Sequence, residues 1–425
     1  MSEKLLLEGL KVIDAGSFIA GPVSPTILSY FGAEVIKIEP PKVGDSLRHL
    51  IARTKRVNPV SDKDYCWHLT SRNKKSLALN LGDPKGQKIL RELVKISDVF
   101  VTNMPQRIRD KLKINASDLL PLNERLIYGS LTGYGEDGPD SHRTAFDTMA
   151  WWARSGLMDI VRPSDDSTPG MPPIGMGDQP TGVSLFASIM TALYRREKTG
   201  KGGEVNTSLM ANGAWSNGSF IQAALFDADF PEKKTEVTPH PFGGRYETKD
   251  GRYLLLAIND AAKEWPKLLK ALDIEYLNGD GRFSTFQKIN ENHQELYKEL
   301  EKIFKQYDLN EMVEKLRFSE VTFGVLSKST DHKKDEQFLK SEVLVNFSED
   351  SFETHNLTVN SPVFLKDEPK KTPSRGPDLG EHSKEILSGI GLDSKELDKL
   401  KEDGVIDFRL QRKIVKKKEY KILNR

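Results

Sequence analysis

Apolar and polar positions in the first half of the chain follow a pattern typical of strands and helices taken in turn. Short apolar runs predict buried strands at 11–14, 34–38, 76–80, 99–102 and 125–131. Between them, the sequence predicts helices at about 24–30 and 84–96, the second with Pro84 in its first turn and an apolar face. Strands that alternate with helices indicate a parallel sheet with helices on both faces, so we predict an α/β fold.

The pattern changes from about residue 225. Residues 244–248 and 250–256 predict a hairpin around an Asp-Gly turn, and helices are expected at 262–272, 293–307 and 309–316. We therefore predict a large domain beginning with 1–220, a smaller α/β domain over 225–335, and a C-terminal segment over 340–425. That last segment is punctuated by prolines and is expected to hold a helix at 382–390.

Composition narrows the class of protein. The 63 basic residues nearly balance the 62 acidic ones, which argues against nucleic acid or a membrane as a bulk partner. The lone Cys66 excludes an internal disulfide framework and suits a reducing cytosol. No stretch approaches the roughly 18 apolar residues of a membrane span. We expect a soluble cytoplasmic protein whose basic end, 409–425, is a solvated tail.

One sequence motif is misleading. Gly133–Gly138 matches the G-x-G-x-x-G spacing of dinucleotide-binding loops and follows a predicted strand. A dinucleotide loop must open directly into a helix, whereas Pro139 and the residues after it predict a further turn. There is also no Walker A, HExxH or G-x-S-x-G sequence and no His/Cys cluster with metal-ligand spacing, so we expect no metal site.

The most informative segment surrounds Asp178. This residue precedes a predicted helix over about 181–196, with Pro180 in the first turn. Asp at such a place commonly caps the helix, which stabilises it by about 1 kcal/mol. Gly175 and Gly177 nevertheless remove bulk beside the carboxylate, so a substrate has room to approach it. From these residues alone the capping role is favoured.

Short motifs along nearly the whole chain alter that balance. Each is weak alone, but they occur together in one order and spacing: Leu10–Asp14, Ala20–Pro22, Phe31–Glu39, Arg72–Ser76, Phe146–Asp147, Gly177–Asp178, Thr199–Gly202 and Gly380–Ser383. In this the chain resembles the class III CoA-transferases, the group that includes formyl-CoA:oxalate and carnitine CoA-transferases. With the resemblance, a catalytic role for Asp178 is favoured over capping.

The resemblance implies a fold and a reaction. The expected fold is a Rossmann-like large domain made from both chain ends, with a small domain inserted between them and two chains interlocked as a homodimer. The expected substrates are an acyl-CoA thioester and a small carboxylic acid, with no tightly bound cofactor. Asp178 corresponds to the carboxylate that attacks the thioester, giving a mixed anhydride and then an aspartyl-CoA thioester. We expect the helix N-terminus to keep Asp178 ionised at neutral pH.

The resemblance also assigns CoA contacts to loops that follow the predicted strands. The corresponding residues are Ile19, Ala20, Leu79, Asn80, Asn103, Met104, Lys111 and Arg143 through Phe146. Three positions depart from the formyl-CoA enzyme: Lys111 and Pro40 each replace an Arg, and Ile19 replaces a Gln. Lys111 keeps the charge but loses the bidentate fork of arginine. These departures speak against oxalate as the substrate.

Three alternatives remain. The α-methylacyl-CoA racemases resemble the chain closely, but they carry a His where this sequence has Phe146, and Phe cannot move a proton. A non-catalytic CoA-binding protein would use Asp178 only as a cap. A dinucleotide-dependent dehydrogenase would rest on Gly133–Gly138 alone.

Overall fold

The computed structural model describes residues 4–50, 61, 63–234, 239–352 and 356–408, so the basic tail 409–425 lies outside the described residues. The chain divides into two compact units. The large unit takes its residues from Met1–Arg162, Thr168–Phe230 and Leu339–Arg425, and the small unit from Pro163–Ser167 and Pro231–Phe338. The domain limits predicted from the sequence, 1–220, 225–335 and 340–425, stay a prediction. Within the described ranges, no helix is both long and apolar enough to cross a membrane.

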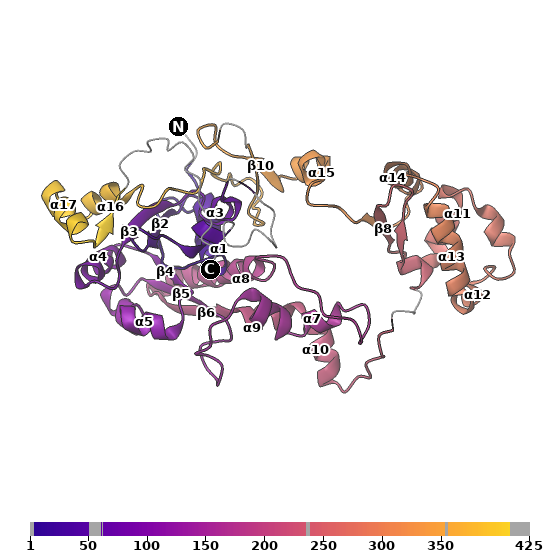
Figure 1. Ribbon diagram of the computed structural model, residues 1–425, viewed down its shortest axis with the longest axis horizontal. Helices are drawn as coiled ribbons and strands as arrows, with labels where there is room; N and C mark the ends of the chain where they lie inside the picture. The colour runs from indigo at the N-terminus through magenta and orange to yellow at the C-terminus, as the bar shows by residue number, and fades with distance from the viewer. Residues whose placement is uncertain (1–3, 51–60, 62, 235–238, 353–355, 409–425) are drawn as a thin grey trace, which may run out of the picture. The chain divides into compact units, whose positions relative to one another are not determined.

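The large unit is built on a seven-stranded sheet in the order β12-β3-β2-β1-β4-β5-β6 (Figure 1). Its strands are β1 (Lys11–Asp14), β2 (Glu34–Glu39), β3 (Lys75–Leu79), β4 (Val99–Thr102), β5 (Ile127–Thr132), β6 (Gly203–Ser208) and β12 (Ile406–Asp407). All neighbouring strands are parallel except β12, which pairs antiparallel with β3. The predicted α/β fold is confirmed. The strand order reverses between β1 and β4, and ligands of such sheets bind at this reversal.

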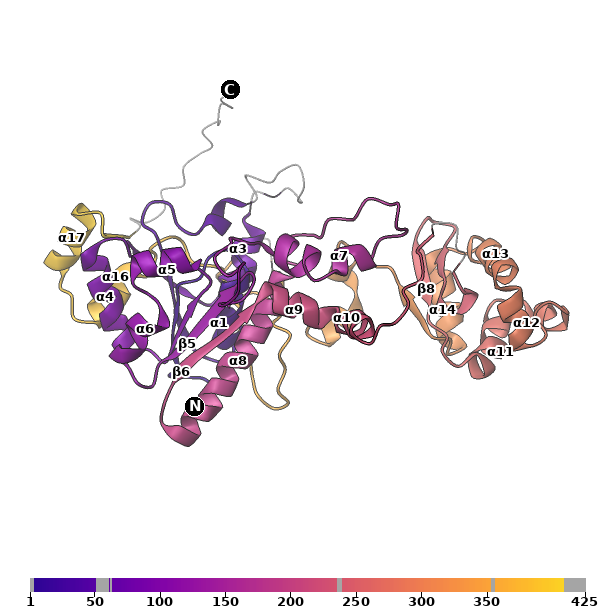
Figure 2. The ribbon, with the colours of Figure 1, turned by 90° about the horizontal axis from the view of Figure 1, so that it is seen from below.

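Two apolar layers cover the two faces of the sheet. Val12 and Val99 point to the face covered by α1 (Ala20–Tyr30) and α8 (Asp178–Thr199). Their neighbours Ile13 and Phe100 point to the opposite face, where α4 (Pro84–Lys95), α16 (Ser383–Gly389) and α17 (Ser394–Glu402) pack. Figure 2 shows α4 and α8 on different sides of the sheet. Successive residues of a strand face opposite ways, so a fully buried parallel strand is apolar throughout.

Helix α1 begins at Ala20, four residues before the predicted start, and every one of its residues is buried. Pro22 lies in its first turn, where its missing N–H is not needed. The remaining elements of this unit are η1 (Ser46–His49), α3 (Tyr65–Thr70), α5 (Gln106–Leu112), α6 (Ala116–Leu119), η2 (Leu120–Leu122), η3 (Thr148–Ala153), α7 (Leu157–Ile160), α9 (Leu209–Ser216), α10 (Gly218–Leu225), β10 (Leu344–Asn346) and β11 (Leu357–Val359). Helix α15 (Glu336–Lys340) crosses the sequence boundary between the units.

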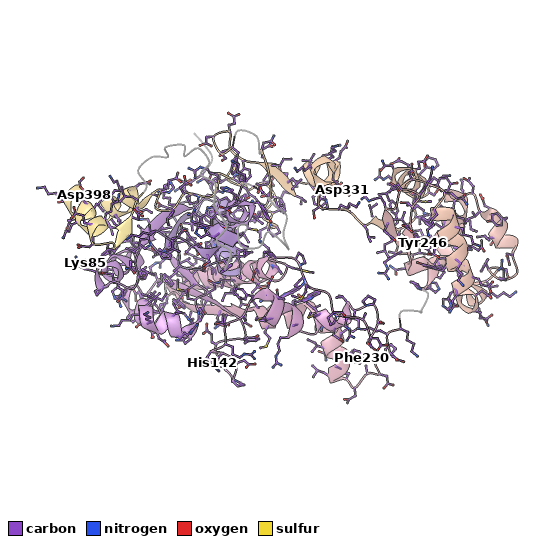
Figure 3. The ribbon with its side chains drawn as sticks, in the orientation of Figure 1. Lys85, His142, Phe230, Tyr246, Asp331 and Asp398 are labelled. Atoms are coloured by element: carbon purple, nitrogen blue, oxygen red, sulfur yellow. The ribbon has the colours of Figure 1, made fainter. Side chains whose placement is uncertain are left out.

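The small unit packs helices on a three-stranded antiparallel sheet. Its elements are η4 (Pro241–Gly243), β7 (Arg245–Glu247), β8 (Tyr253–Leu256), α11 (Ala261–Ala271), η5 (Glu275–Gly279), α12 (Phe286–Glu291), α13 (His293–Phe304), α14 (Leu309–Phe318), β9 (Phe323–Val325) and η6 (His332–Lys334). The predicted hairpin is confirmed as β7 and β8, with Gly251 at a φ of 69° in the turn. Tyr246, labelled in Figure 3, is buried and stacks on Phe304 with ring centroids 4.4 Å apart.

Candidate active site

The loop after β1 is locked to the loop after β4. The Ser17 amide donates to Oδ1 of Asn103 at 2.7 Å, and Nδ2 of Asn103 donates back to the Ser17 carbonyl at 2.9 Å. A Cβ on Gly21 would lie 2.8 Å from Cγ of Asn103, so a side chain there would displace the amide. These contacts fix the start of α1 at the point where the strand order reverses.

A buried ionic network supports the loop after β1. Nζ of Lys37 lies 2.9 Å from Oδ2 of Asp45 and donates to the Gly16 carbonyl, while Nζ of Lys74 lies 2.8 Å from Oδ2 of Asp14. Burial acts to raise the pKa of Asp14, but the two lysines and the Gly16 amide outweigh it, so the pKa lies below its usual value. The network therefore holds the Asp14 carboxylate ionised and anchors the loop.

Helix α8 places Asp178 at its first position. Gly177 occupies the N-cap, with φ −94° and ψ −29°, and no side chain caps the helix. The capping role considered for Asp178 is wrong, because the helical turn already begins at Gly177, whose carbonyl accepts from the amide of Thr181 at 3.2 Å. The Asp178 carboxyl group is therefore not engaged by the end of its own helix.

Close backbone packing sets the position of α8. A Cβ on Gly182 would lie 2.4 Å from Cβ of Val23 in α1, and one on Gly177 would lie 2.5 Å from the indole of Trp151. Gly175 has a φ of 78°, and a Cβ placed on it would lie 3.3 Å from the side chain of Ile19. Glycine at these three places lets the start of α8 approach the start of α1 closely.

A second carboxylate lies behind the turn. Oδ2 of the buried Asp147 accepts from the Gly177 amide at 3.2 Å, and Oδ1 accepts from its own neighbour, the Thr148 amide, at 2.8 Å. Burial, reinforced by the charge of Asp147, raises the pKa of Asp178 to about 7. The expected full ionisation of Asp178 at neutral pH is therefore wrong. The helix N-terminus is outweighed by lost hydration and by a like charge.

Asp178 opens into a cavity of about 250 Å³, here called the Asp178 cavity. The predicted residues that line it with Asp178 are Ala20, Asn103, Met104 and Arg143 through Phe146. Among the described residues of its wall, Asp178 is the sole carboxylate, and none is a His, Lys or Cys. Arg143 is held by an ion pair with Asp140 at 3.0 Å and comes from the loop that also carries His142, labelled in Figure 3.

A second cavity of about 280 Å³, the Lys111 cavity, follows along the same edge of the sheet. Of the predicted residues, it is lined by Leu79, Asn80, Met104 and Lys111. Met104 lines both cavities, so they adjoin at the carboxyl ends of the strands. Ile19 lines neither. It is buried behind the Asp178 cavity, against Gly175.

Two features of the site escaped the sequence reasoning. Phe18 lines the Asp178 cavity at a φ of 60°, and the charge of the distant Asp147 adds to the effect of burial in raising the pKa of Asp178. A large apolar residue directly after the Gly16-Ser17 turn was a signal for the first. Nothing local in the sequence signals the second. The Gly133–Gly138 loop opens into no helix, as predicted, and Glu136 ties it to Arg109.

The chain is similar to known proteins along nearly its whole length. Residues 7–383 match the model of CoA-transferase family III. The chain is 30% identical to (R)-2-hydroxy-4-methylpentanoate CoA-transferase of Clostridioides difficile over 95% of this chain and 100% of that protein. It is 30% identical to cinnamoyl-CoA:phenyllactate CoA-transferase of Clostridium sporogenes, over 96% and 98% of the two chains.

Among solved structures, a CAIB/BAIF family protein from Brucella suis superposes with a TM-score of 0.79 at 26% identity. That match covers 91% of this chain and 100% of the other. The family match spans the loops after β1, β3, β4 and β5 as well as the start of α8, so it includes both cavities. The chain belongs to CoA-transferase family III and is an enzyme of the CoA-transferase class.

Proposed function

We propose that the protein transfers CoA from an acyl-CoA thioester to a carboxylic acid, with Asp178 as the nucleophile. The observation that carries this proposal is the isolation of Asp178, which is the one carboxylate among the described residues of its cavity wall. The turn that holds it is fixed from Asp147, Trp151 and Ile19. A fixed nucleophile in a partly closed cavity gains from proximity and from exclusion of competing water.

The chemistry proceeds in two matched halves. The Asp178 carboxylate attacks the thioester carbonyl, forming an acyl-aspartyl anhydride and releasing CoA thiolate. The thiolate attacks the aspartyl carbonyl of the anhydride, which forms the aspartyl-CoA thioester and releases the first acid. The second acid attacks this thioester, and the thiolate then attacks the new acyl group, forming the new acyl-CoA and regenerating Asp178. The bonds to Asp178 are formed and broken again, and one acyl-CoA thioester is formed for each one that is broken, so no external energy source is needed.

The raised pKa of Asp178 fits this role. A carboxylate is a weak nucleophile, and its basicity rises with the pKa of its acid. At a pKa of about 7, the group is more basic than an ordinary aspartate yet still substantially ionised at neutral pH. The same loss of hydration that raises the pKa also leaves the nucleophile less shielded by water.

We assign the CoA chain to the row of cavities. The thioester lies at Asp178, the pantetheine arm passes Asn103 and Met104, and the nucleotide reaches the Lys111 cavity. Support comes from the position of both cavities at the carboxyl ends of the parallel strands, where such sheets bind nucleotides. Lys111 supplies positive charge that CoA phosphates require.

The test is Asp178→Asn, which retains shape but removes the nucleophile. We expect CoA exchange between an acyl-CoA and a free acid, followed by mass spectrometry of the CoA products, to fall below detection. Hydroxylamine added during turnover of the wild type should mark Asp178 and no other carboxylate. Near-normal turnover of the Asp178→Asn protein, with deamidation excluded by intact mass, would rule out covalent catalysis by this residue.

A second assay distinguishes the proposed transferase from a racemase. Phe146 occupies the position where a racemase places a proton-transferring base, so the hydrogen next to the thioester should stay in place. In heavy water without an acceptor acid, a 2-methylacyl-CoA should take up no deuterium at a rate comparable with turnover. Rapid uptake would favour the isomerase instead.

We also propose a homodimer. Helices α9 and α10 and the residue after α10 expose large apolar side chains: Trp215 is 87% exposed, and Leu225 and Phe226 are 71% and 78% exposed. Phe230, labelled in Figure 3, is also exposed, and its ring lies 6.4 Å from that of the exposed Phe220 in α10. Apolar surface of this extent on a folded unit is typical of a protein interface. Light scattering coupled to gel filtration should give twice the mass of one chain.

A further inference from the structure

The wall of the Asp178 cavity contains two aromatic rings in contact. Phe18 and Phe146 meet edge to face, with centroids 5.7 Å apart and planes at 77°. Both rings line the cavity, and Phe146 is 51% exposed although the residue after it, Asp147, is buried. Ring edges and faces left open in this way offer a large apolar contact surface to a ligand.

Both rings are tied to the turn that holds Asp178. Phe146 directly precedes Asp147, whose carboxylate accepts from the Gly177 amide. Phe18 directly precedes Ile19, which lies against Gly175. The two rings therefore flank the nucleophile through their immediate sequence neighbours, and an acyl group attached to Asp178 has them within reach.

Phe18 is kept in a costly backbone conformation. Its φ of 60° is left-handed, which costs a bulky residue roughly 1–2 kcal/mol. Oδ1 of Asp45 holds it there by accepting from the Phe18 amide at 3.1 Å and from the Ser17 hydroxyl at 3.2 Å. Asp45 is itself buried and paired with Lys37. The loop therefore fixes the ring in the cavity wall despite the strain.

Charge in the cavity is sparse. Among the described residues of its wall, the ionisable groups are Asp178 and Arg143, and Arg143 is already paired with Asp140 and lies over the ring of Tyr134. A second carboxylate on the acyl group would lose hydration beside apolar residues and face the charge of Asp178. An uncharged acyl group meets neither penalty.

We propose that the acyl group accepted beside Asp178 is an uncharged aromatic or branched aliphatic one, and that dicarboxylic acyl groups are rejected. The proposal rests on the transferase function and names its substrate class. The Phe18 and Phe146 rings select the acyl group by apolar contact, and the scarcity of cations in the wall excludes a distal carboxylate.

The experiment pairs each acyl-CoA with its own acid carrying a carbon isotope label, so that a single acyl group fills the cavity in both halves of the reaction. Label entering the acyl-CoA is measured by mass spectrometry for 3-phenylpropanoyl-CoA and 4-methylpentanoyl-CoA, and for succinyl-CoA and glutaryl-CoA. We expect exchange per enzyme at low substrate to be at least about 100-fold faster for the first pair.

Two variants locate the selectivity. Phe146→Arg places a cation in the wall and should shift the ratio at least about 10-fold toward succinyl-CoA, whereas Phe146→Leu should keep the apolar preference. The matched control is Phe318→Arg, which changes an 88% exposed ring outside the cavity wall and should leave the ratio unchanged. Equal exchange of succinyl-CoA and 3-phenylpropanoyl-CoA by the wild type would overturn the substrate class while leaving the transferase intact. Absence of label in every acyl-CoA would overturn both.

Discussion

Two aspartates at the same edge of the sheet, one buried and one half-buried, have pKa values shifted in opposite directions. Asp14 ends β1 and is completely buried, yet its pKa lies below the usual value because Lys37 and Lys74 face it. Asp178 begins α8, is less completely buried, and has a pKa raised to about 7, with the like charge of Asp147 adding to the effect of burial. The difference shows that burial alone does not assign a role to a carboxylate. The sign of the neighbouring charges distinguishes a structural anchor from a reactive group.

The largest effect is expected on the free energy of unfolding, when a lysine that faces Asp14 is removed. Lys74→Met removes one of the two cations that neutralise Asp14, and loss of a partner from a buried pair destabilises by about 3–5 kcal/mol. The free energy of unfolding in urea measures this. Lys75→Met is the matched control, because Lys75 is partly exposed and its pairs with Glu34 and Glu385 contribute at most about 1 kcal/mol each. Equal losses from both variants would contradict the anchoring role of the network.

The next effect concerns the position of Asp178. Gly177→Ala would place a Cβ 2.5 Å from the Trp151 indole, so the turn must shift and carry Asp178 with it. A shift of about 1 Å in a nucleophile lowers the rate of the chemical step by about 100-fold. We expect kcat for CoA exchange to fall by this order while KM for acyl-CoA changes little. Gly170→Ala, where the new methyl group would meet open space, should behave as wild type.

Much of the fold could be predicted because a buried parallel strand is a continuous run of apolar residues in the sequence. Strands β1 and β4 have the predicted limits. Strand β6 was missed, since Gly203–Ser208 is largely polar, and β12 has two residues, too few to form a pattern. Helix α1 was predicted too short because its first turn contains Gly21 and Pro22, which are typical of loops.

The candidate site likewise has features that could be predicted from the sequence and features that could not. Asp178 stands in a local pattern of glycines before a helix, so the sequence identified it, and the family resemblance gave it a role. Its pKa is raised by burial and by the charge of Asp147, and the ring of Phe18 is placed by a contact from Asp45, so both depend on residues distant in sequence. Local sequence rules describe the helix dipole but not a like charge brought in from a distant loop.

The pH dependence of activity tests that distant charge. The nucleophile is the carboxylate form, so kcat/KM of the wild type should rise with pH through about 7. Asp147→Asn removes the like charge but keeps an acceptor for the Gly177 amide, so the midpoint of the rise should move to lower pH by about half a unit to one unit. Glu92→Gln, on the exposed side of α4, should leave the midpoint in place. A midpoint that is unchanged in the Asp147→Asn protein would show that Asp147 does not act on Asp178 by charge.

The smallest effect lies in the stability of the fold. The pKa of Asp178 is raised from 3.8 in the unfolded chain to about 7 in the folded protein, so the folded state binds this proton more tightly. The resulting stabilisation is complete below pH 3.8 and is lost as the pH rises through about 7. Asp178→Asn has no proton to lose, so relative to the wild type it should gain stability between about pH 5 and pH 8, by about 1 kcal/mol because the group retains some water. Urea unfolding of both proteins at the two pH values measures the difference. A variant that loses stability relative to the wild type over this range would mean that Asp178, like Asp14, is held ionised by the fold, and the contrast between the two aspartates would disappear.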